Sequence, residues 1–98
     1  MKTEEDIWKK LEDVLGGGSA FRVILHLALN PNQAFTKYAL VKLTGLRTPA
    51  VDNQLKTLVR LNMVKEYPYT PKTYKINLDD ELARNIIEFL QKIKLIRG

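Results

Sequence analysis

The residues best suited to chemistry are polar side chains that recur at helical spacing between positions 47 and 60. Asn53, Lys56 and Arg60 follow one another at intervals of three and four residues, so they share one face of a helix. Amide, ammonium and guanidinium groups presented together in this way can bind phosphates and the edges of bases. The sequence therefore predicts a nucleic-acid-binding surface. Its candidate members are Arg47, Thr48, Asn53, Lys56, Thr57 and Arg60.

These side chains differ in what they can recognise. Asn53 can pair with adenine through two hydrogen bonds, and Arg47 or Arg60 can pair with guanine in the same way. A second group would hold phosphates and set the register without reading sequence. The members of this second group are Thr36, Lys37, Lys72 and Lys75.

The patterns that catalysis and metal binding require are absent from the sequence. There is no cysteine, and the single histidine, His26, shares a polar edge with Arg22 and Asn30 and has no ligand-type residue at metal-binding spacing. The glycines at 16–18 lack the Lys and Ser/Thr that follow in a nucleotide-binding loop. No nucleophile is paired with a base. We therefore expect no enzymatic activity, no cofactor and no metal site.

Positive charge is concentrated in the part of the chain that carries the candidate residues. The formal net charge of the chain is +5, whereas residues 36–76 hold eight Lys or Arg against only Asp52 and Glu66. A basic surface at this place is the pattern expected for contact with phosphates. The alternative is a lysine-rich surface that serves solubility alone. The coincidence of charge and helical motif favours DNA.

Two helices and a tight turn must position these residues. Thr36 is an N-cap candidate for the first helix, and Gly45 suits the left-handed residue that ends it. Thr48 is expected to cap the second helix, with Pro49 at its first position. The second helix also carries an apolar stripe on the side opposite its polar face. The residues of this stripe are Val51, Leu55, Leu58 and Val59.

This helix-turn-helix resembles that of the winged helix-turn-helix proteins, in particular the MarR-like and ArsR-like small dimeric regulators of prokaryotes. The resemblance covers residues 19–78 and includes the exit Leu58-Val59-Arg60-Leu61-Asn62-Met63-Val64. Asn62 stands where those families have glycine, and asparagine tolerates a positive φ better than other non-glycine residues. The resemblance implies a recognition helix over 48–62 in the major groove and a wing over 64–78 on the backbone or minor groove.

The other elements of the core follow from hydrophobic periodicity. A central helix is expected over 19–30, and a short strand over 33–35 with Phe35 buried. The hairpin should pair strands 64–67 and 73–78, although an ordinary surface hairpin with protected edges is the alternative to a wing. Three residues of its second strand should alternate inward, namely Tyr74, Ile76 and Leu78.

The two ends of the chain are predicted to be amphipathic helices, over residues 3–15 and 79–97, the second beginning at Asp79 or Asp80. The last helix carries a heptad seam over two repeats, wider than one small domain needs. Since large apolar patches usually mark interfaces, we expect a homodimer; the alternative is a helix that folds back on its own domain. The expected interface residues are Ile7, Trp8, Leu11, Leu82, Ile86, Phe89, Leu90, Ile93 and Ile96.

The sequence thus predicts one α+β domain over residues 1–98, mainly α with a small β-hairpin, built as a winged helix-turn-helix with N- and C-terminal dimerisation helices. The resemblance implies a homodimeric transcriptional regulator, a repressor, that binds double-stranded DNA sequence-specifically. No apolar run or signal pattern indicates a membrane protein or an exported one, so we expect a cytoplasmic protein. Two alternatives stay open, a sequence-tolerant architectural or chromatin protein and a winged-helix protein–protein interaction module. A small-molecule effector is also left open.

Overall fold

The structure is a computed structural model, and it describes residues 18–93. In this part of the chain the fold is α+β, with four helices and one three-stranded antiparallel sheet. The helix expected over 3–15 lies outside the described residues. The elements in chain order are α2 (Gly18–Leu29), β1 (Phe35–Thr36), α3 (Lys37–Thr44), α4 (Thr48–Arg60), β2 (Val64–Tyr67), β3 (Thr73–Ile76) and α5 (Glu81–Lys92).

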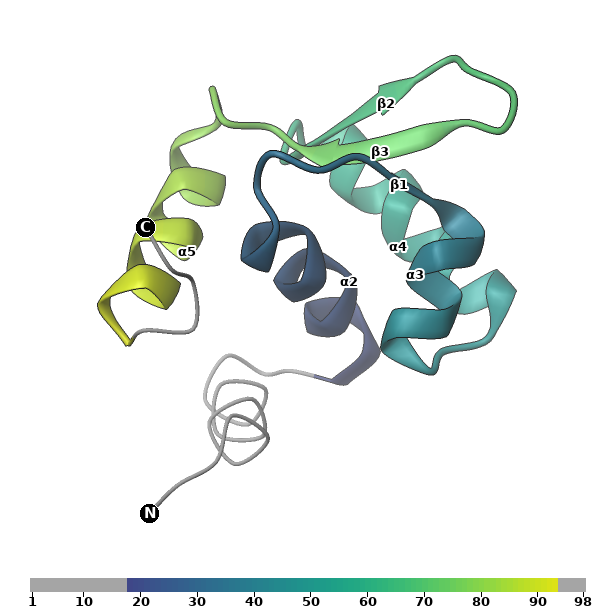
Figure 1. The fold of residues 1–98 in the computed structure, drawn as a ribbon, viewed down its shortest axis with the longest axis horizontal. Helices are drawn as coiled ribbons and strands as arrows, with labels where there is room; N and C mark the ends of the chain where they lie inside the picture. Colours follow the sequence, from purple (N-terminus) through teal and green to yellow (C-terminus); the bar gives the residue numbers. More distant parts are fainter. Residues whose placement is uncertain (1–17, 94–98) are drawn as a thin grey trace.

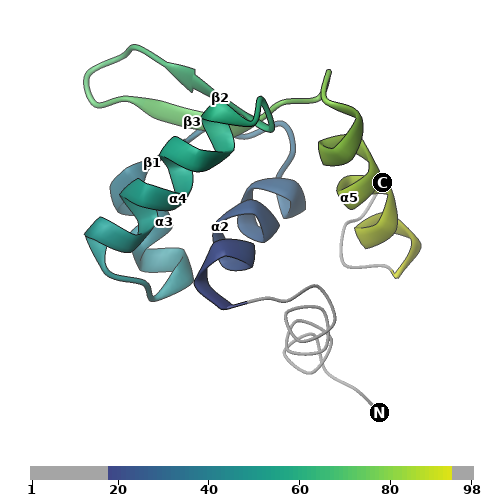
Figure 2. The same ribbon diagram turned by 180° about the vertical axis from the view of Figure 1, so that it is seen from behind.

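Helix α2 lies at the centre of the fold (Figures 1 and 2). Helix α5 flanks it on one side, α3 and α4 flank it on the other, and the sheet lies across the top in the view of Figure 1. Contacts join α2 to α3, α4, α5 and β3. The prediction of a central core helix is confirmed, because its apolar residues are buried. They are Phe21, Val23, Ile24, Leu25, Leu27 and Ala28.

The sheet has the strand order β1-β3-β2, and two of its strand boundaries differ from the sequence prediction. Strand β1 begins at Phe35 because the Gln33 N–H donates to the Asn30 carbonyl, at 3.0 Å, in the turn after α2 and so is not available to a strand. Strand β3 ends at Ile76. The inward position expected for Leu78 is wrong, since Asn77 is buried there and Leu78 is exposed.

Helix α4 begins one residue earlier than the sequence suggests. Its first helical hydrogen bond runs from the Val51 N–H to the Arg47 carbonyl, at 3.1 Å, so Arg47 is the extended N-cap residue. Thr48 is therefore the first helical residue and cannot cap the helix, and Pro49 follows it. The Arg47 side chain makes no capping hydrogen bond, which leaves its guanidinium outside the helix.

The end of α4 is closed by Asn62, whose φ of 65° confirms the left-handed conformation predicted for it. The Asn62 N–H donates to the Val59 carbonyl and the Met63 N–H to the Leu58 carbonyl, both at 3.0 Å. This pair of hydrogen bonds is the Schellman motif, with asparagine in the place that glycine usually takes. The chain thereby turns directly from α4 into β2.

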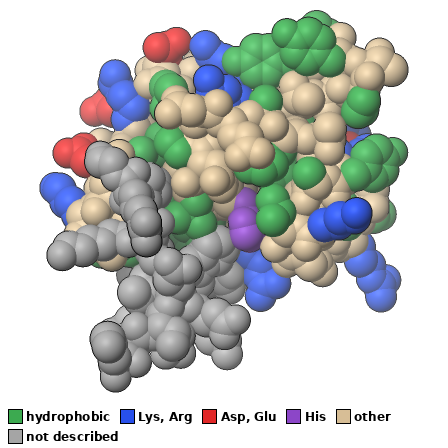
Figure 3. Space-filling model, viewed as in Figure 1, with side chains coloured by type: hydrophobic (Ala, Val, Ile, Leu, Met, Phe, Trp, Pro, Cys, Tyr) green, Lys and Arg blue, Asp and Glu red, His purple; other side chains and the backbone are tan. Residues whose placement is uncertain are grey.

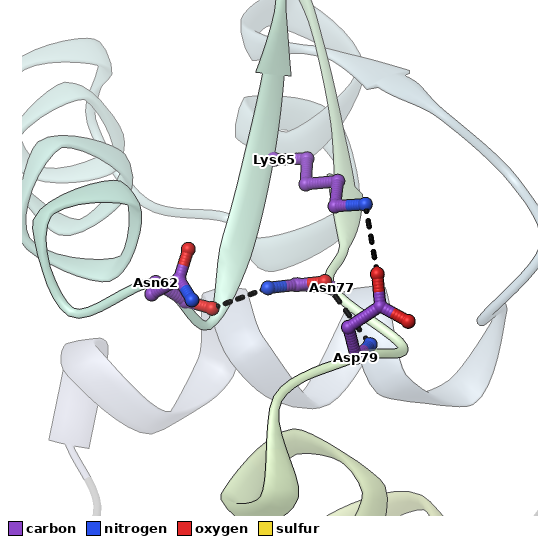
Figure 4. A network of polar contacts seen from close by, with 4 residues as sticks. All are labelled: Asn62, Lys65, Asn77 and Asp79. Carbon is purple, nitrogen blue, oxygen red and sulfur yellow. Dashed lines mark hydrogen bonds and ion pairs between the residues drawn. The ribbon is translucent and has the colours of Figure 1, made fainter.

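A buried asparagine, Asn77, ties this turn to the end of β3 (Figure 4). The Asn77 side chain donates to the Asn62 carbonyl at 2.8 Å and accepts from the Asp79 N–H at 3.1 Å. Its backbone N–H donates to the Met63 carbonyl at 2.8 Å. An exposed ion pair between Lys65 and Asp79, at 3.3 Å, lies beside it. Asn77 therefore fixes where α4 ends relative to the sheet.

Replacing Asn77 by alanine should destabilise the fold by about 1–3 kcal/mol, because two side-chain hydrogen bonds are lost, one to the Asn62 carbonyl and one from the Asp79 N–H. Urea denaturation of the variant and the wild type measures the difference. Lys65→Ala is the control, since it removes only an exposed ion pair and should cost about 0–1 kcal/mol. Equal stability of Asn77→Ala and wild type would contradict this role.

Candidate nucleic-acid interface

The rotation of α4 about its axis decides which of its residues face solvent. Val51, Leu55 and Leu58 are buried in the core, as the apolar stripe predicted. The opposite side carries Asn53 and Arg60, both exposed. Of the other candidates on this helix, Lys56 is exposed as well and Thr57 is half-buried; Pro49, in the first turn, is also exposed. The polar face of α4 therefore lies on the surface of the described domain.

The start of α4 is held in place by the turn that precedes it. Gly45 has a φ of 73°, and its N–H donates to the Val41 carbonyl at 3.0 Å, which ends α3 as predicted. The buried Thr44 hydroxyl donates to the Leu40 carbonyl, at 2.7 Å, and accepts from the Leu46 N–H. Arg22 of α2 donates to the Thr44 carbonyl at 3.2 Å. The turn is thus anchored to the central helix, which sequence periodicity does not reveal.

An acidic residue lies among the candidate cations. Asp52 pairs with Lys56 of the same helix at 3.1 Å, and with Lys37, the first residue of α3, at 3.5 Å. The hydrogen bond from Lys56 holds the pKa of Asp52 below its ordinary value, and the charge of Lys37 adds to the effect. Asp52 therefore stays ionised and joins the two helices at the surface. The Asp52–Lys56 spacing of four residues could have been read from the sequence, whereas the Lys37 contact could not.

The hairpin places a second acid–base pair and two stacked tyrosines near its tip. Glu66 and Lys72 are 3.8 Å apart. The Tyr67 and Tyr69 rings stack with centroids 6.2 Å apart, and Tyr69 is exposed. Hydrophobic side chains gather over this tip at the upper right of Figure 3, whereas Lys and Arg side chains stand out at the lower right, around α3 and the turn to α4. Tyr67 and Tyr69 were not among the residues predicted to bind.

Tyr74 lies on the inner face of the hairpin, opposite Glu66. Burial raises the pKa of Tyr74 to about 12, and the neighbouring Glu66 carboxylate contributes to the rise. Its hydroxyl is therefore protonated at physiological pH. Tyr74 acts as a core residue of the sheet, as its alternation in the sequence predicted.

The arginines at the two ends of α4 have no carboxylate partner among the described residues, unlike the lysines that pair with Asp52 and Glu66. Within residues 18–93, neither Arg47 nor Arg60 makes an ion pair, and both side chains are exposed. They lie at the two ends of α4, which is about 20 Å long at 1.5 Å per residue. The exposed Asn53 lies between them. This arrangement leaves two guanidinium groups and an amide available to a ligand along one helix.

The residues predicted to contact phosphates do not all lie on the same face of the structure. Thr36 is used as the N-cap of α3, where its hydroxyl accepts from the Ala39 N–H at 3.1 Å, as predicted for a cap. Lys75 lies between two inward residues of β3, so it projects from the other face of the sheet. There it is opposite Lys65 of β2. Lys75 is therefore separated from the face that α4 packs against.

The expected dimer residues divide into two groups along α5, which begins at the Asp80 cap. Leu82 and Phe89 are exposed, and Ile86 and Ile93 are half-buried. The assignment of Leu90 is wrong, because it is completely buried against the core of its own chain. One side of α5 therefore folds back on the domain, as the alternative held, and leaves a neighbouring apolar edge uncovered by the described residues. The remaining expected interface residues, Ile7, Trp8, Leu11 and Ile96, lie outside the described part of the chain.

His26 is half-buried on α2. Burial lowers the pKa of His26 below its ordinary value, and the nearby Arg22 lowers it further, so the imidazole is neutral at pH 7. Among residues 18–93 no three His, Cys, Asp or Glu side chains are grouped to hold a metal ion. In the same range no helix has the length and apolar character to cross a membrane. Comparisons with known protein families, characterised proteins and solved structures find no match.

The lowered pKa of His26 predicts a loss of stability on acidification. Between pH 7 and pH 5 the unfolded chain takes up a proton at this residue more readily than the folded chain, so the free energy of unfolding should fall as the pH falls. His26→Gln should flatten this part of the curve, as measured by Tm across the pH range. An unchanged pH profile in the variant would show that another group is responsible.

Proposed function

We propose that the chain is a DNA-binding protein of the winged helix-turn-helix type, in which the polar face of α4 enters the major groove. The observation that carries the proposal is the exposed polar face of α4 with Asn53 and Arg60, together with the exposed Arg47 at its N-cap. Both guanidinium groups lie outside any ion pair in the described domain. A major groove about 12 Å wide admits an α-helix, and arginine and asparagine are side chains that pair bidentately with guanine and adenine.

The order and packing of the elements support this reading. Helix α3, the glycine turn and α4 are followed directly by the hairpin, and the core side of α4 packs on α2 and β2. In a helix-turn-helix the second helix offers its free face to bases, and the resemblance to winged helix-turn-helix proteins implies that the hairpin lies on the flanking backbone or minor groove. Arg47 and Arg60 can bind a base or a phosphate without first breaking an ion pair. Lys37, Lys56 and Lys72 must first exchange an internal carboxylate for a phosphate.

We further propose that the protein acts as a homodimer through the uncovered edge of α5, and that it represses by occupying a promoter. Leu82 and Phe89 are exposed one above the other, two turns apart on this helix. Helix α5 has Glu81 in its first turn and Lys92 in its last, so two antiparallel copies would place opposite charges together. A twofold pair would present two copies of α4 to half-sites about 34 Å apart.

Arg60→Ala should weaken binding to a preferred duplex by about 1–3 kcal/mol, since it removes a guanidinium that no carboxylate of residues 18–93 shares. Fluorescence anisotropy at fixed salt, with a duplex selected from a random library, measures the change. Arg84→Ala, which removes another exposed arginine, on α5, is the control for net charge and should bind like the wild type. Equal affinities of Arg60→Ala and Arg84→Ala would remove Arg60 from the site.

Phe89→Glu should convert the dimer to a monomer, because it places a charge in the centre of the apolar edge. Sedimentation velocity measures the mass, and Asn85→Glu, on an exposed polar position of the same helix, is the control and should leave the dimer intact. A Phe89→Glu variant with the mass of the wild type would contradict this interface.

The same duplex experiments separate the alternatives. An architectural protein would bind selected and random duplexes equally, with a steep dependence on salt. A protein–protein interaction module would bind neither duplex.

A further inference from the structure

We propose that Asp52 is a positioning residue that limits binding to DNA of random sequence, by holding Lys37 and Lys56 in internal ion pairs at the edge of the binding face. The inference rests on the proposed function and deepens it. It assigns the discrimination between preferred and random sequence in part to a residue that is itself repelled by phosphate.

The position of Asp52 suits this role. It is the only acid in α3 and α4, and it lies on the flank of α4 that faces the start of α3. Its two oxygens are divided between the two lysines: Oδ2 contacts Lys56 at 3.1 Å and Oδ1 contacts Lys37 at 3.5 Å. One carboxylate thus engages an ammonium group from each helix of the motif.

The exposure of the three side chains makes this pairing reversible. Lys56 is 74% exposed, whereas Lys37 and Asp52 are 30% and 32% exposed. The pair with Lys56 is at an exposed position, where ion pairs are weak, and the pair between the partly buried Lys37 and Asp52 is longer, at 3.5 Å. A well-placed phosphate can therefore replace the carboxylate. On a random sequence α4 fits the bases poorly, so the DNA phosphates are not well placed beside Lys37 and Lys56. Such a phosphate cannot compensate for the loss of the ion pairs with Asp52 or for its own repulsion by the Asp52 carboxylate. Preferred sequences are therefore affected less than random ones.

Glu66, the other acid within residues 36–76, does not hold two lysines from different helices. Among the lysines of residues 18–93, Glu66 is ion-paired with Lys72 alone, at the longer distance of 3.8 Å, and it lies beside the hydroxyl of Tyr74 in the hairpin. It therefore restrains one lysine near the tip and does not join α3 to α4.

Asp52→Asn tests the proposal, because it keeps the size of the side chain and releases both lysines. With full-length protein, the Kd for a random 20-base-pair duplex should fall about tenfold at 0.1 M salt, and the slope of log K against log salt should steepen by about 1–2, at roughly 0.9 per added phosphate contact. Affinity for the selected duplex should change by less than about threefold, so the ratio between the two duplexes falls.

Glu88→Gln removes one negative charge from an exposed position on α5 and is the matched control. Adding Lys56→Gln to Asp52→Asn should return the random-duplex affinity most of the way to that of the wild type. Circular dichroism confirms that each variant is folded. If folded Asp52→Asn binds the random duplex no more tightly than Glu88→Gln, the inference is overturned and the proposed function stands. If the wild type binds neither duplex at low salt, both are overturned.

Discussion

The burial of Val51, Leu55 and Leu58 is the constraint on which the rest of the structure depends. Removing three large aliphatic side chains from water stabilises the fold by about 1.5–3 kcal/mol each, so α4 cannot rotate without losing most of that energy. Because the apolar stripe is fixed against α2 and β2, the polar side of α4 is directed to solvent. The surface chemistry of this helix is thus a consequence of core packing.

Long-range polar contacts then fix both ends of α4. Arg22 reaches the turn before it, across 22 positions of sequence, and Asn77 reaches the turn after it, across 15. A helix held at both ends and along one side presents its free side chains in a preorganised arrangement. Preorganisation reduces the entropy lost when a ligand is bound, which is what a surface that reads a rigid duplex requires.

The sequence predicted the parts of this arrangement that depend on local signals. Thr36, Gly45 and Asn62 mark helix ends because a cap or a left-handed residue is a property of one position, and the apolar stripe of α4 is visible as periodicity. The predicted N-cap of α4 was wrong by one residue. Either Arg47 or Thr48 could take the N-cap position before Pro49, and only the folded turn selects between them. Contacts between elements distant in the chain could not be predicted from the sequence. The partner of Lys37, the anchor on Thr44 and the burial of Leu90 all depend on which helices pack together. The heptad spacing on α5 fits either the core or a second copy, and the helix divides its apolar residues between a buried side and an uncovered one.

The central claim, that the free face of α4 is a DNA-binding surface, is tested most directly by NMR titration of the ¹⁵N-labelled chain with duplex DNA. Our account predicts that the shifted amide resonances map to Arg47–Arg60, to the start of α3 and to the hairpin tip, and that α5 is unaffected by the DNA itself. Shifts confined to α5, or no shifts at low salt, would contradict it.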